Sequence, residues 1–256
     1  MSILLVNNIK KSYEGPNSKT LKVLDEVSFA LGNNEFLSIV GPTGCGKTTL
    51  LNIISGIEPF NSGSFSYDSK ANITLAYLFQ RDALFPWKTV IDNIAFPLLM
   101  RKVENSIIDE KVRYWVDLLG LSSFSEYYPA QLSQGMRKKV ALGSALVYEP
   151  DVIFMDEPFS ALDAQTKNKL QQELINIWET RKVAVIFVTH DVAEAIFLSD
   201  RILTMTTIPA KIKNEHIVSI PRHRDFLEMI SMPEFGKLYR EIWNELNVEI
   251  GDNNAV

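Results

Sequence analysis

One segment constrains the fold of this chain more than any other. Residues 41–48 read Gly-Pro-Thr-Gly-Cys-Gly-Lys-Thr, which fits the pattern G-x-x-x-x-G-K-[ST] at every fixed position. The segment follows the apolar run Phe36 to Val40 and precedes the apolar pair Leu50-Leu51, the order expected for strand, loop and helix. Glycines let the N–H groups of such a loop turn inward around phosphate oxygens, and the following helix N-terminus adds partial positive charge. The segment therefore predicts a phosphate-binding loop in an α/β fold.

This loop, called the P-loop below, gives two side chains distinct duties. Lys47 is expected to neutralise the β- and γ-phosphate oxygens of a nucleotide, and the Thr48 hydroxyl to ligate Mg²⁺. Cys45 occupies a variable position of the pattern, so we interpret it as a filler. The residues predicted to contact the nucleotide here are Gly41, Pro42, Thr43, Gly44, Cys45, Gly46, Lys47, Thr48 and Thr49.

Composition places the chain among globular proteins and limits the classes of molecule that it is expected to bind. Its 256 residues, 46% hydrophobic and 22% charged, suffice for one large domain or two small ones. The net charge of -5 argues against binding nucleic acid or anionic lipid over the whole surface. The single cysteine, Cys45, excludes an internal disulfide, and no apolar run approaches the roughly 18 residues of a membrane span. We therefore expect a protein that is neither exported nor membrane-spanning and that binds no nucleic acid.

The apolar periodicity predicts an α/β core. Strand-like patterns occupy the first third of the chain, at Leu4 to Ile9, Lys22 to Leu31 and Glu35 to Val40. Two more strand candidates lie between residues 64 and 79. Further on, Val152 to Met155 and Val183 to Val188 are continuous apolar runs typical of parallel strands buried on both faces, and a predicted helix over residues 164–180 connects them.

Helical spacing marks the middle and the end of the chain. Thr89 can cap a helix that runs to about Arg101. A second helix is predicted from the spacing of Ile108, Val112, Trp115, Val116 and Leu119, and a third, in the tail from Pro221, from that of Phe235, Leu238, Tyr239, Ile242, Trp243 and Leu246. The predicted organisation is a single domain with an α/β core (1–84 and 150–220), a helical insert (85–149) and a C-terminal helical extension (221–256).

A pair of acidic residues follows the predicted strand that ends at Met155. Asp156 is placed to hold the Mg²⁺ shell, and Glu157 to accept a proton from an attacking water. Two other nucleotide-binding classes fit less well. A GTPase would carry an [NT]-K-x-D motif, but the nearest string, residues 166–169, ends in lysine. A small-molecule kinase would carry a basic lid, but the only dense basic cluster, residues 137–139, lies beside a different motif.

That motif is Leu132-Ser133-Gln134-Gly135-Met136, which opens a helix predicted to run to about Val147. The chain also carries Tyr13, Gln80, the string Ser160-Ala161-Leu162-Asp163, and His190. With these residues, the P-loop and the acidic pair, the sequence resembles the ATP-binding subunits of ABC transporters across nearly its whole length. The resemblance implies ATP hydrolysis and a P-loop NTPase fold of the ABC ATPase type, with a mixed β/α core, an antiparallel β subdomain and an inserted helical subdomain.

The resemblance also implies individual roles. Tyr13 would stack on adenine, Gln80 would reach Mg²⁺ or the attacking water, and His190 would contact the γ-phosphate. The implied catalytic residues are Lys47, Gln80, Glu157 and His190, and the implied Mg²⁺ ligands are Thr48, Gln80 and Asp156.

Part of the implied site belongs to a second chain. Ser133, Gln134 and Gly135 would bind the γ-phosphate of an ATP held by the partner's P-loop, and Asp163 would link the two sites. Because the chain contains one G-K-[ST] string, we expect a head-to-tail homodimer around two ATP. Gln134 replaces the first glycine of the commoner Leu-Ser-Gly-Gly form, and Gly143-Ser144 stands where the family usually has a small residue followed by arginine. These departures leave open the rate of ATP turnover and the affinity of the dimer.

Two short sequence segments indicate one branch of this family. Residues 84–87 (Leu-Phe-Pro-Trp) and 92–96 (Asp-Asn-Ile-Ala-Phe) are most similar to the nitrate, sulfonate and taurine import branch of the family. The expected function is therefore an ATPase subunit on the cytoplasmic face of a membrane, working with a membrane-spanning permease and a separate substrate-binding protein. In the family, the stretch from Phe85 to Asn93 helps to form the cleft for a permease helix. The alternatives are a soluble ABC ATPase without a permease and a non-hydrolysing module in which ATP only fastens two chains together.

Overall fold

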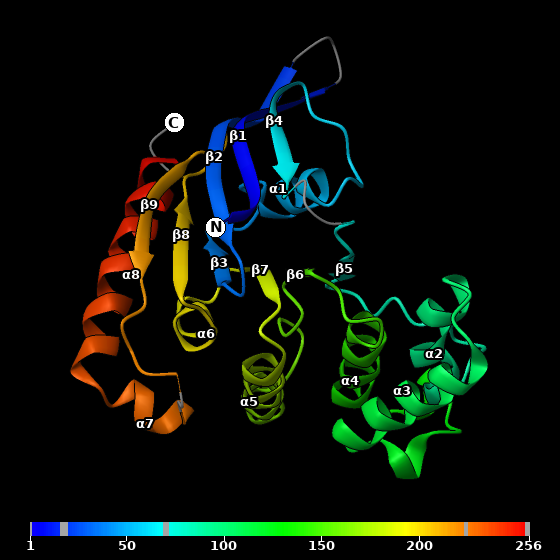
Figure 1. The fold of residues 1–256 in the computed structure, drawn as a ribbon. Helices are drawn as coiled ribbons and strands as arrows, with labels where there is room; N and C mark the ends of the chain where they lie inside the picture. The colour runs from blue at the N-terminus through cyan, green and yellow to red at the C-terminus, as the bar shows by residue number, and fades with distance from the viewer. Residues whose placement is uncertain (1, 16–19, 69–71, 223–224, 254–256) are drawn as a thin grey trace. The chain divides into compact units, whose positions relative to one another are not determined.

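The computed structural model describes residues 2–15, 20–68, 72–222 and 225–253, with the side chains of 248–253 excepted (Figure 1). The chain forms two compact units, one made of residues 1–73 and 175–256, the other of residues 74–174. The second unit is larger than the predicted helical insert because it also contains two strands and the start of a helix. The predicted division into an α/β core, a helical insert and a C-terminal extension stays a prediction.

The first unit begins with a three-stranded antiparallel sheet. Its strands are β1 (Ser2–Glu14), β2 (Thr20–Gly32) and β4 (Ser62–Tyr67), in the order β2-β1-β4. Apolar residues of β1 and β2 face the core, where Leu4, Ile9 and Leu31 are fully buried. The predicted strands of the first third are thus present, and β1 and β2 are longer than their apolar patterns indicate.

A second sheet in this unit carries the P-loop. Strands β7 (Ala184–Thr189), β3 (Phe36–Val40), β8 (Arg201–Met205) and β9 (Ile212–Ile217) lie side by side in that order, and only β9 runs antiparallel to its neighbour. Every residue of β3 and β7 is buried, as their continuous apolar sequences predict.

Helices pack around this sheet. Helix α1 (Lys47–Ile54) packs against β7, and α6 (Val192–Leu198) packs against β3 and β7. The C-terminal extension forms α7 (Phe226–Ile230) and α8 (Pro233–Asn253), and α8 packs on α6 and β8. Ile242 and Leu246 of α8 are buried, in agreement with the predicted helical spacing of the tail.

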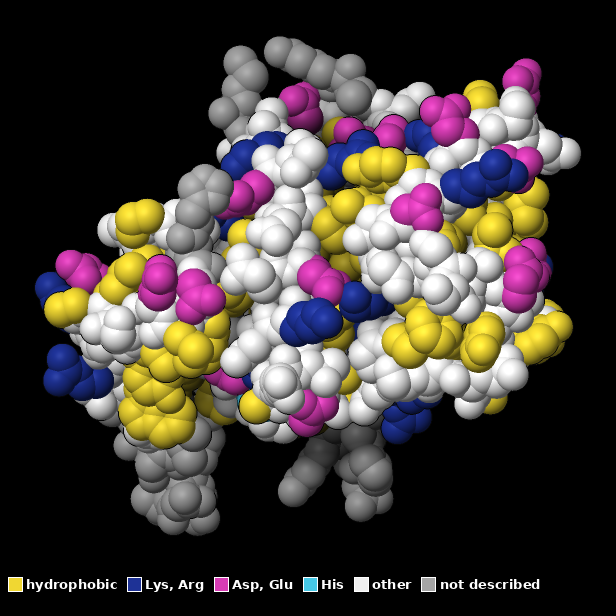
Figure 2. Space-filling model, turned by 90° about the horizontal axis from the view of Figure 1, so that it is seen from below, with side chains coloured by type: hydrophobic (Ala, Val, Ile, Leu, Met, Phe, Trp, Pro, Cys, Tyr) yellow, Lys and Arg dark blue, Asp and Glu magenta, His cyan; other side chains and the backbone are white. Residues whose placement is uncertain are grey.

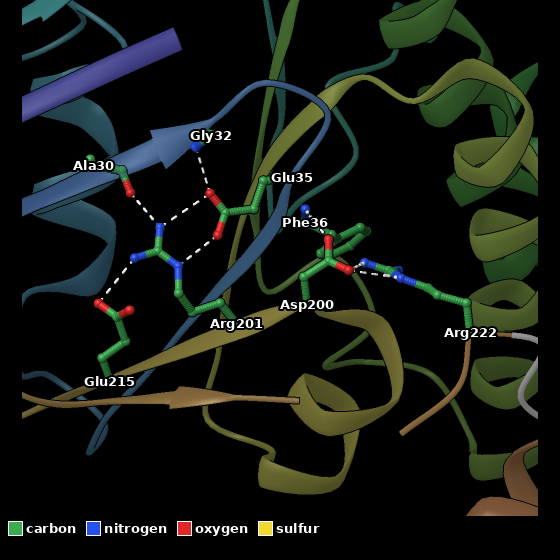
Figure 3. A network of polar contacts seen from close by, with 8 residues as sticks. All are labelled: Ala30, Gly32, Glu35, Phe36, Asp200, Arg201, Glu215 and Arg222. Atoms are coloured by element: carbon green, nitrogen blue, oxygen red, sulfur yellow. Dashed lines mark hydrogen bonds and ion pairs between the residues drawn. The ribbon is translucent and has the colours of Figure 1, made fainter. Parts of the chain in front are cut away.

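An ion-pair network joins the chain before β3 to the start of β8 and to β9 (Figure 3). Arg201 Nε lies 2.6 Å from Glu35 Oε1, and Arg201 Nη1 lies 3.0 Å from Glu215 Oε2. The side chains of Arg201 and Glu35 are only 15% and 16% exposed. Because the largely buried charges of Arg201 and Glu35 are paired with each other, the network joins these strands without leaving either charge uncompensated.

A second arm of the network reaches the C-terminal extension. Asp200 accepts a hydrogen bond from the Phe36 N–H at 2.9 Å and another from Arg222 Nε at 2.9 Å. The Arg222 guanidinium also lies 4.0 Å from the ring centroid of Trp178. Arg222 therefore ties the segment that leads to α7 onto the sheet by an ion pair and a cation–π contact.

The second unit combines a strand pair with a helical bundle. Strands β5 (Leu75–Leu78) and β6 (Val152–Asp156) are parallel, with Leu78 opposite Met155. Helices α2 (Val90–Met100), α3 (Asn105–Leu118) and α4 (Gln134–Leu146) pack against one another, and α5 (Ala164–Arg181) begins in this unit and ends in the other. Two short 3₁₀ turns, Ser122–Phe124 and Pro129–Gln131, lead into α4.

The helix signals identified in the sequence are confirmed in this unit. Thr89 caps α2 by accepting a hydrogen bond from the Asp92 N–H at 3.3 Å. The α3 residues predicted to face the core are all buried, namely Ile108, Val112, Trp115 and Val116, as is Leu119 just after them. Gly143 of α4 packs so closely that a Cβ there would lie 2.8 Å from Leu119 Cδ1 and 3.2 Å from Ile94 Cδ1. A small residue at position 143 is therefore needed for α4 to approach α2 and α3.

No helix among the described residues has the length and apolar character needed to cross a membrane. On the face drawn in Figure 2, acidic and basic side chains are interspersed with hydrophobic and uncharged ones. The mixed charge on this face agrees with the small negative net charge of the sequence.

Candidate active site

The P-loop connects the buried end of β3 to the first turn of α1. Gly44 and Gly46 adopt positive φ angles of 79° and 105°, which a side-chain-bearing residue adopts only at a cost in energy. Gly46 is the N-cap of α1, and no side chain caps this helix. Gly46 has no side chain, so the N-cap residue itself supplies no acceptor at the helix end where an anion binds best.

The P-loop is also packed closely against its surroundings. A Cβ on Gly46 would lie 2.7 Å from Val23 Cγ1, and one on Gly41 would lie 3.1 Å from Met205 Cβ. Cys45 is buried, with 2% of its surface exposed. The glycines thus allow both the turn of the chain and its close approach to β2 and to the end of β8.

Lys47 is buried at the start of α1, and its ammonium group turns back onto the P-loop. Its Nζ donates hydrogen bonds to the carbonyl oxygens of Gly41, at 2.8 Å, and Pro42, at 3.0 Å. The ammonium group therefore lies over the loop whose N–H groups are predicted to bind phosphate. An anion at the loop would form a charge-assisted bond with this ammonium group.

The register of the sheet brings His190 to the same end as the P-loop. Val40 is paired with Thr189, so Gly41 and His190 each follow one member of that pair. His190 is exposed and precedes Asp191, the N-cap of α6, whose side chain accepts a hydrogen bond from the Glu194 N–H at 3.1 Å. His190 thus lies directly after β7 and shortly before α6; its contact with phosphate stays a prediction.

Tyr13, the residue expected to stack on adenine, is 38% exposed near the end of β1. Its hydroxyl hydrogen-bonds to Glu58, and the Lys11 ammonium lies 4.6 Å from its ring centroid. Burial raises the pKa of the Tyr13 hydroxyl, the bond to Glu58 raises it further, and the Thr49 side chain opposes the shift. The ring is thus held beside the first turn of α1 with part of its surface open to solvent, an arrangement that permits stacking.

The second unit holds the acidic pair and Gln80 at the ends of β5 and β6. Asp156 is the last residue of β6 and is 6% exposed. Glu157 follows with a φ of 42°, an uncommon conformation for a residue other than glycine and one that recurs at functional sites. The Gln80 side chain donates to Ser160 Oγ at 3.4 Å, and Ser160 Oγ donates to the Glu157 carbonyl at 3.0 Å. Ser160 therefore links two of the predicted catalytic residues.

The motif that opens α4 meets the start of α5. Ser133 caps α4 by accepting a hydrogen bond from the Met136 N–H at 3.3 Å. A Cβ on Gly135 would lie 2.8 Å from Thr166 Cγ2. Asp163 Oδ1 accepts from the Thr166 N–H at 3.0 Å, and hydrogen bonds from the main chain and hydroxyl of Thr166 lower the pKa of Asp163. Thr166 thus lies between Asp163 and the motif that opens α4.

A buried lysine that is not among the residues predicted from the sequence, Lys138, joins the same region. Lys138 of α4 is 4% exposed, and its Nζ donates to the Gln80 carbonyl oxygen at 2.6 Å and lies 2.9 Å from Asp82 Oδ1. Arg137 Nε lies 3.3 Å from the other oxygen of Asp82. In the sequence, only the basic cluster at residues 137–139 indicates this contact. Two of its members, Arg137 and Lys138, bind the loop that contains Gln80 and Asp82.

Comparison with known proteins gives consistent likenesses. A family profile described as "ABC transporter" matches residues 24–160. The aliphatic sulfonates import ATP-binding protein SsuB of Bacillus cereus is 40% identical over 226 residues, 86% of this chain and 88% of that protein. The taurine import ATP-binding protein TauB of Pelagibacter ubique is 36% identical over 255 residues, 95% of this chain and 96% of that protein.

The fold is likewise similar to a solved structure. The dimeric post-hydrolysis state of the ATP-binding cassette MJ0796, bound to ADP and Pi, matches with a TM-score of 0.74 and 26% sequence identity, covering 85% of this chain and 100% of that one. The fold class predicted from the sequence is thereby confirmed.

Proposed function

This chain belongs to the ABC transporter family, and on that premise we propose that it is the ATP-hydrolysing subunit of an importer for a small anion such as a sulfonate, taurine or nitrate. Support for import comes from relatives named for sulfonate and taurine import that align over most of both chains. The transported molecule is recognised by other subunits in this family, so the choice among these anions rests on the relatives alone.

The P-loop residues of the first unit are suited to binding a nucleoside triphosphate. The P-loop geometry is the main support for this function. Two of its glycines have positive φ angles, the following helix has no side-chain cap at its N-terminus, and Lys47 Nζ donates to a loop carbonyl. Such a site binds phosphate oxygens through N–H groups and one ammonium group. Bound ATP with Mg²⁺ supplies the phosphoanhydride bond whose hydrolysis drives transport, and Thr48, Gln80 and Asp156 would hold the ion.

The chain's own side chains would then divide the catalytic work. Lys47 binds phosphate oxygens, and His190 donates a hydrogen bond to the γ-phosphate. Glu157 orients the attacking water and accepts its proton, and Gln80 positions the same water. The adenine ring lies against Tyr13.

We assign the remaining motif residues to a homodimer. Ser133, Gln134 and Gly135 of one chain face the nucleotide of the other, and Asp163 communicates between the two sites. The similar cassette MJ0796 was solved as a dimer, which supports this assembly. Among the described residues of α4, the exposed Ser133 and Gln134 stand at its N-terminus, where the helix dipole favours an anion.

We assign the permease site to a hollow in the second unit. The hollow, of about 350 Å³, opens between β5, α2 and α4, and its lining includes Phe96, Met100, Ser144 and Tyr148. Ser144 stands where the family pattern has arginine, so a short side chain leaves this hollow open. Its occupant would be a short cytoplasmic helix of a membrane-spanning permease, which would hold the protein on the cytoplasmic face of the membrane and act with a separate substrate-binding protein.

We propose that the Phe85 to Asn93 stretch contributes to permease binding through an exposed side chain on a fixed loop. Asn93 is buried, and its side-chain amide bonds to the main chain of Phe85, Lys88 and Thr89, which fixes the loop. Trp87 on that loop is 71% exposed. Asn93 therefore shapes the loop, whereas Trp87 is available to a partner.

Cross-linking combined with co-purification tests this function. Met100, 63% exposed, lines the hollow, and Leu227 on α7, 71% exposed, lies in the other unit and serves as the control position. In solubilised membranes, Met100→Cys should cross-link to a membrane-spanning protein that co-purifies with the chain and raises its ATPase activity, whereas Leu227→Cys should not. ATPase activity without any co-purifying membrane protein would favour a soluble ABC ATPase, and absence of activity in both preparations would favour a non-hydrolysing module.

A further inference from the structure

Three metal-ligating side chains that are not among the predicted nucleotide-binding residues gather in the first unit. Glu241 and Glu245 lie one turn apart on α8, and His216 lies on β9. The candidate ligand atoms of these three residues all lie within 4.8 Å of one another. The His216 side chain is 6% exposed, whereas that of Glu241 is 53% exposed. A buried imidazole therefore faces one carboxylate that solvent can reach.

Glu245 determines which ring nitrogen of His216 carries a proton. Its Oε2 lies 3.2 Å from His216 Nε2 and accepts from the Thr204 hydroxyl at 3.0 Å, while its Oε1 accepts from the Asn214 side-chain amide at 2.8 Å. An ionised carboxylate can only accept hydrogen bonds, so Nε2 is the protonated nitrogen. In the neutral ring, Nδ1 then presents a lone pair.

That lone pair points toward a second acceptor. His216 Nδ1 lies 3.5 Å from Glu241 Oε1, beyond the usual range of about 2.7 to 3.2 Å for an N–H···O hydrogen bond. Nitrogen and oxygen ligands about 2.1 Å from a tetrahedral Zn²⁺ stand about 3.4 Å apart. The observed spacing therefore suits a cation shared by the two groups better than a direct hydrogen bond.

We propose that His216 Nδ1 and Glu241 Oε1 bind a divalent transition-metal cation such as Zn²⁺, with Glu245 positioning the imidazole and water completing the coordination. Imidazole with carboxylate suits zinc, and a ligating histidine whose other N–H is held by a carboxylate is the usual arrangement around that metal. The site joins β9 to α8, so a bound cation fastens the C-terminal extension to the sheet. It shares no residue with the predicted Mg²⁺ ligands.

Calorimetric titration of the full chain with Zn²⁺, in excess Mg²⁺ and without nucleotide, tests the proposal. Glu241→Gln removes a largely exposed ligand oxygen without emptying buried space, and it should weaken Zn²⁺ binding at least tenfold relative to the unaltered chain. Glu234→Gln, in the exposed first turn of the same helix, is the matched control and should bind Zn²⁺ like the unaltered chain. Zn²⁺ should also raise the melting temperature of the unaltered chain but not that of Glu241→Gln.

Equal Zn²⁺ affinity in the unaltered chain and Glu241→Gln would overturn the proposal. Nitrogen NMR gives an independent check: added Zn²⁺ should shift the His216 Nδ1 resonance in the unaltered chain and not in Glu241→Gln. A Zn²⁺-induced shift confined to Nε2 would also overturn the proposal, because that nitrogen faces Glu245.

Discussion

The ammonium group of Lys138 donates a hydrogen bond of 2.6 Å to the main-chain carbonyl of Gln80. Lys138 lies on α4, the helix opened by the motif at residues 132–136, and Gln80 is a predicted catalytic residue whose side chain reaches Ser160. Because Asp82 also pairs with Lys138, two points of the loop after β5 are attached to one buried side chain. The position of Gln80 therefore depends on α4.

Replacement of Lys138 by methionine keeps the length and apolar stem of the side chain but removes these bonds. Losing a hydrogen bond to a charged group lowers the free energy of unfolding by about 1.5 to 3 kcal/mol. The ATP hydrolysis rate should fall about tenfold or more, because Gln80 is displaced, while the affinity for ATP stays unchanged. Urea unfolding, nucleotide binding and steady-state ATPase assays measure the three quantities separately.

Lys139→Met is the matched control for this variant. Lys139 pairs with Glu173 and the Leu119 carbonyl rather than with the Gln80 loop. Lys139→Met should lower the free energy of unfolding but leave the ATP hydrolysis rate of the folded protein near that of the unaltered chain. Equal loss of rate in both variants would contradict the positioning role of Lys138.

The contact between Gly135 and Thr166 permits a rescue experiment. Gly135→Ala places a methyl group 2.8 Å from Thr166 Cγ2, so the start of α4 must move away from α5. ATPase activity should fall while binding of ATP to the P-loop persists. Adding Thr166→Ser removes the opposing methyl group, keeps the hydroxyl that bonds to Asp163, and should restore most of the activity. No recovery in the double variant would show that the loss has another cause.

The sequence was sufficient for features that depend on neighbours along the chain. The strand, loop and helix around Lys47, the Thr89 cap and the apolar face containing Trp115 follow from local spacing, and the structure confirms them. These signals are local because glycine conformation, capping and helical periodicity each involve only a few consecutive residues.

Features that depend on distant partners could not be read in the same way. The Gln80 carbonyl that Lys138 contacts lies 58 residues away, and Arg201 pairs with Glu35 across 166 residues. A charged residue in a sequence has the same appearance whether it faces solvent or a buried carboxylate. The pairing of Val40 with Thr189, which brings His190 to the P-loop end of the sheet, likewise depends on strand order rather than on composition.

Two P-loop glycines should differ in their tolerance of alanine. Gly44→Ala meets no atom within 4 Å and costs only the left-handed backbone conformation, about 1 kcal/mol. Gly46→Ala adds a contact of 2.7 Å with Val23 Cγ1, so the loop and the start of α1 must shift. Fluorescent ATP analogue binding should weaken far more in Gly46→Ala than in Gly44→Ala, and the reverse order would contradict the loop geometry.

The Arg201 network should contribute strongly to stability. Arg201→Met leaves the largely buried Glu35 carboxylate without its partner, which lowers the free energy of unfolding by about 3 kcal/mol. Lys211→Met breaks the solvent-exposed pair between Lys211 and Asp25 and should produce little measurable change. Denaturant unfolding of both variants gives the comparison, and similar stability losses would mean that burial does not set the contribution of these pairs.

ATP hydrolysis by this chain should depend on Glu157, the residue assigned to accept the proton of the attacking water. The most direct measurement is ATP turnover by Glu157→Gln beside the unaltered chain, with nucleotide retention and dimer mass recorded in the same samples. We predict that turnover falls on the order of 10²-fold or more, that ATP remains bound, and that the dimer accumulates. Undiminished turnover in Glu157→Gln would show that Glu157 does not accept this proton.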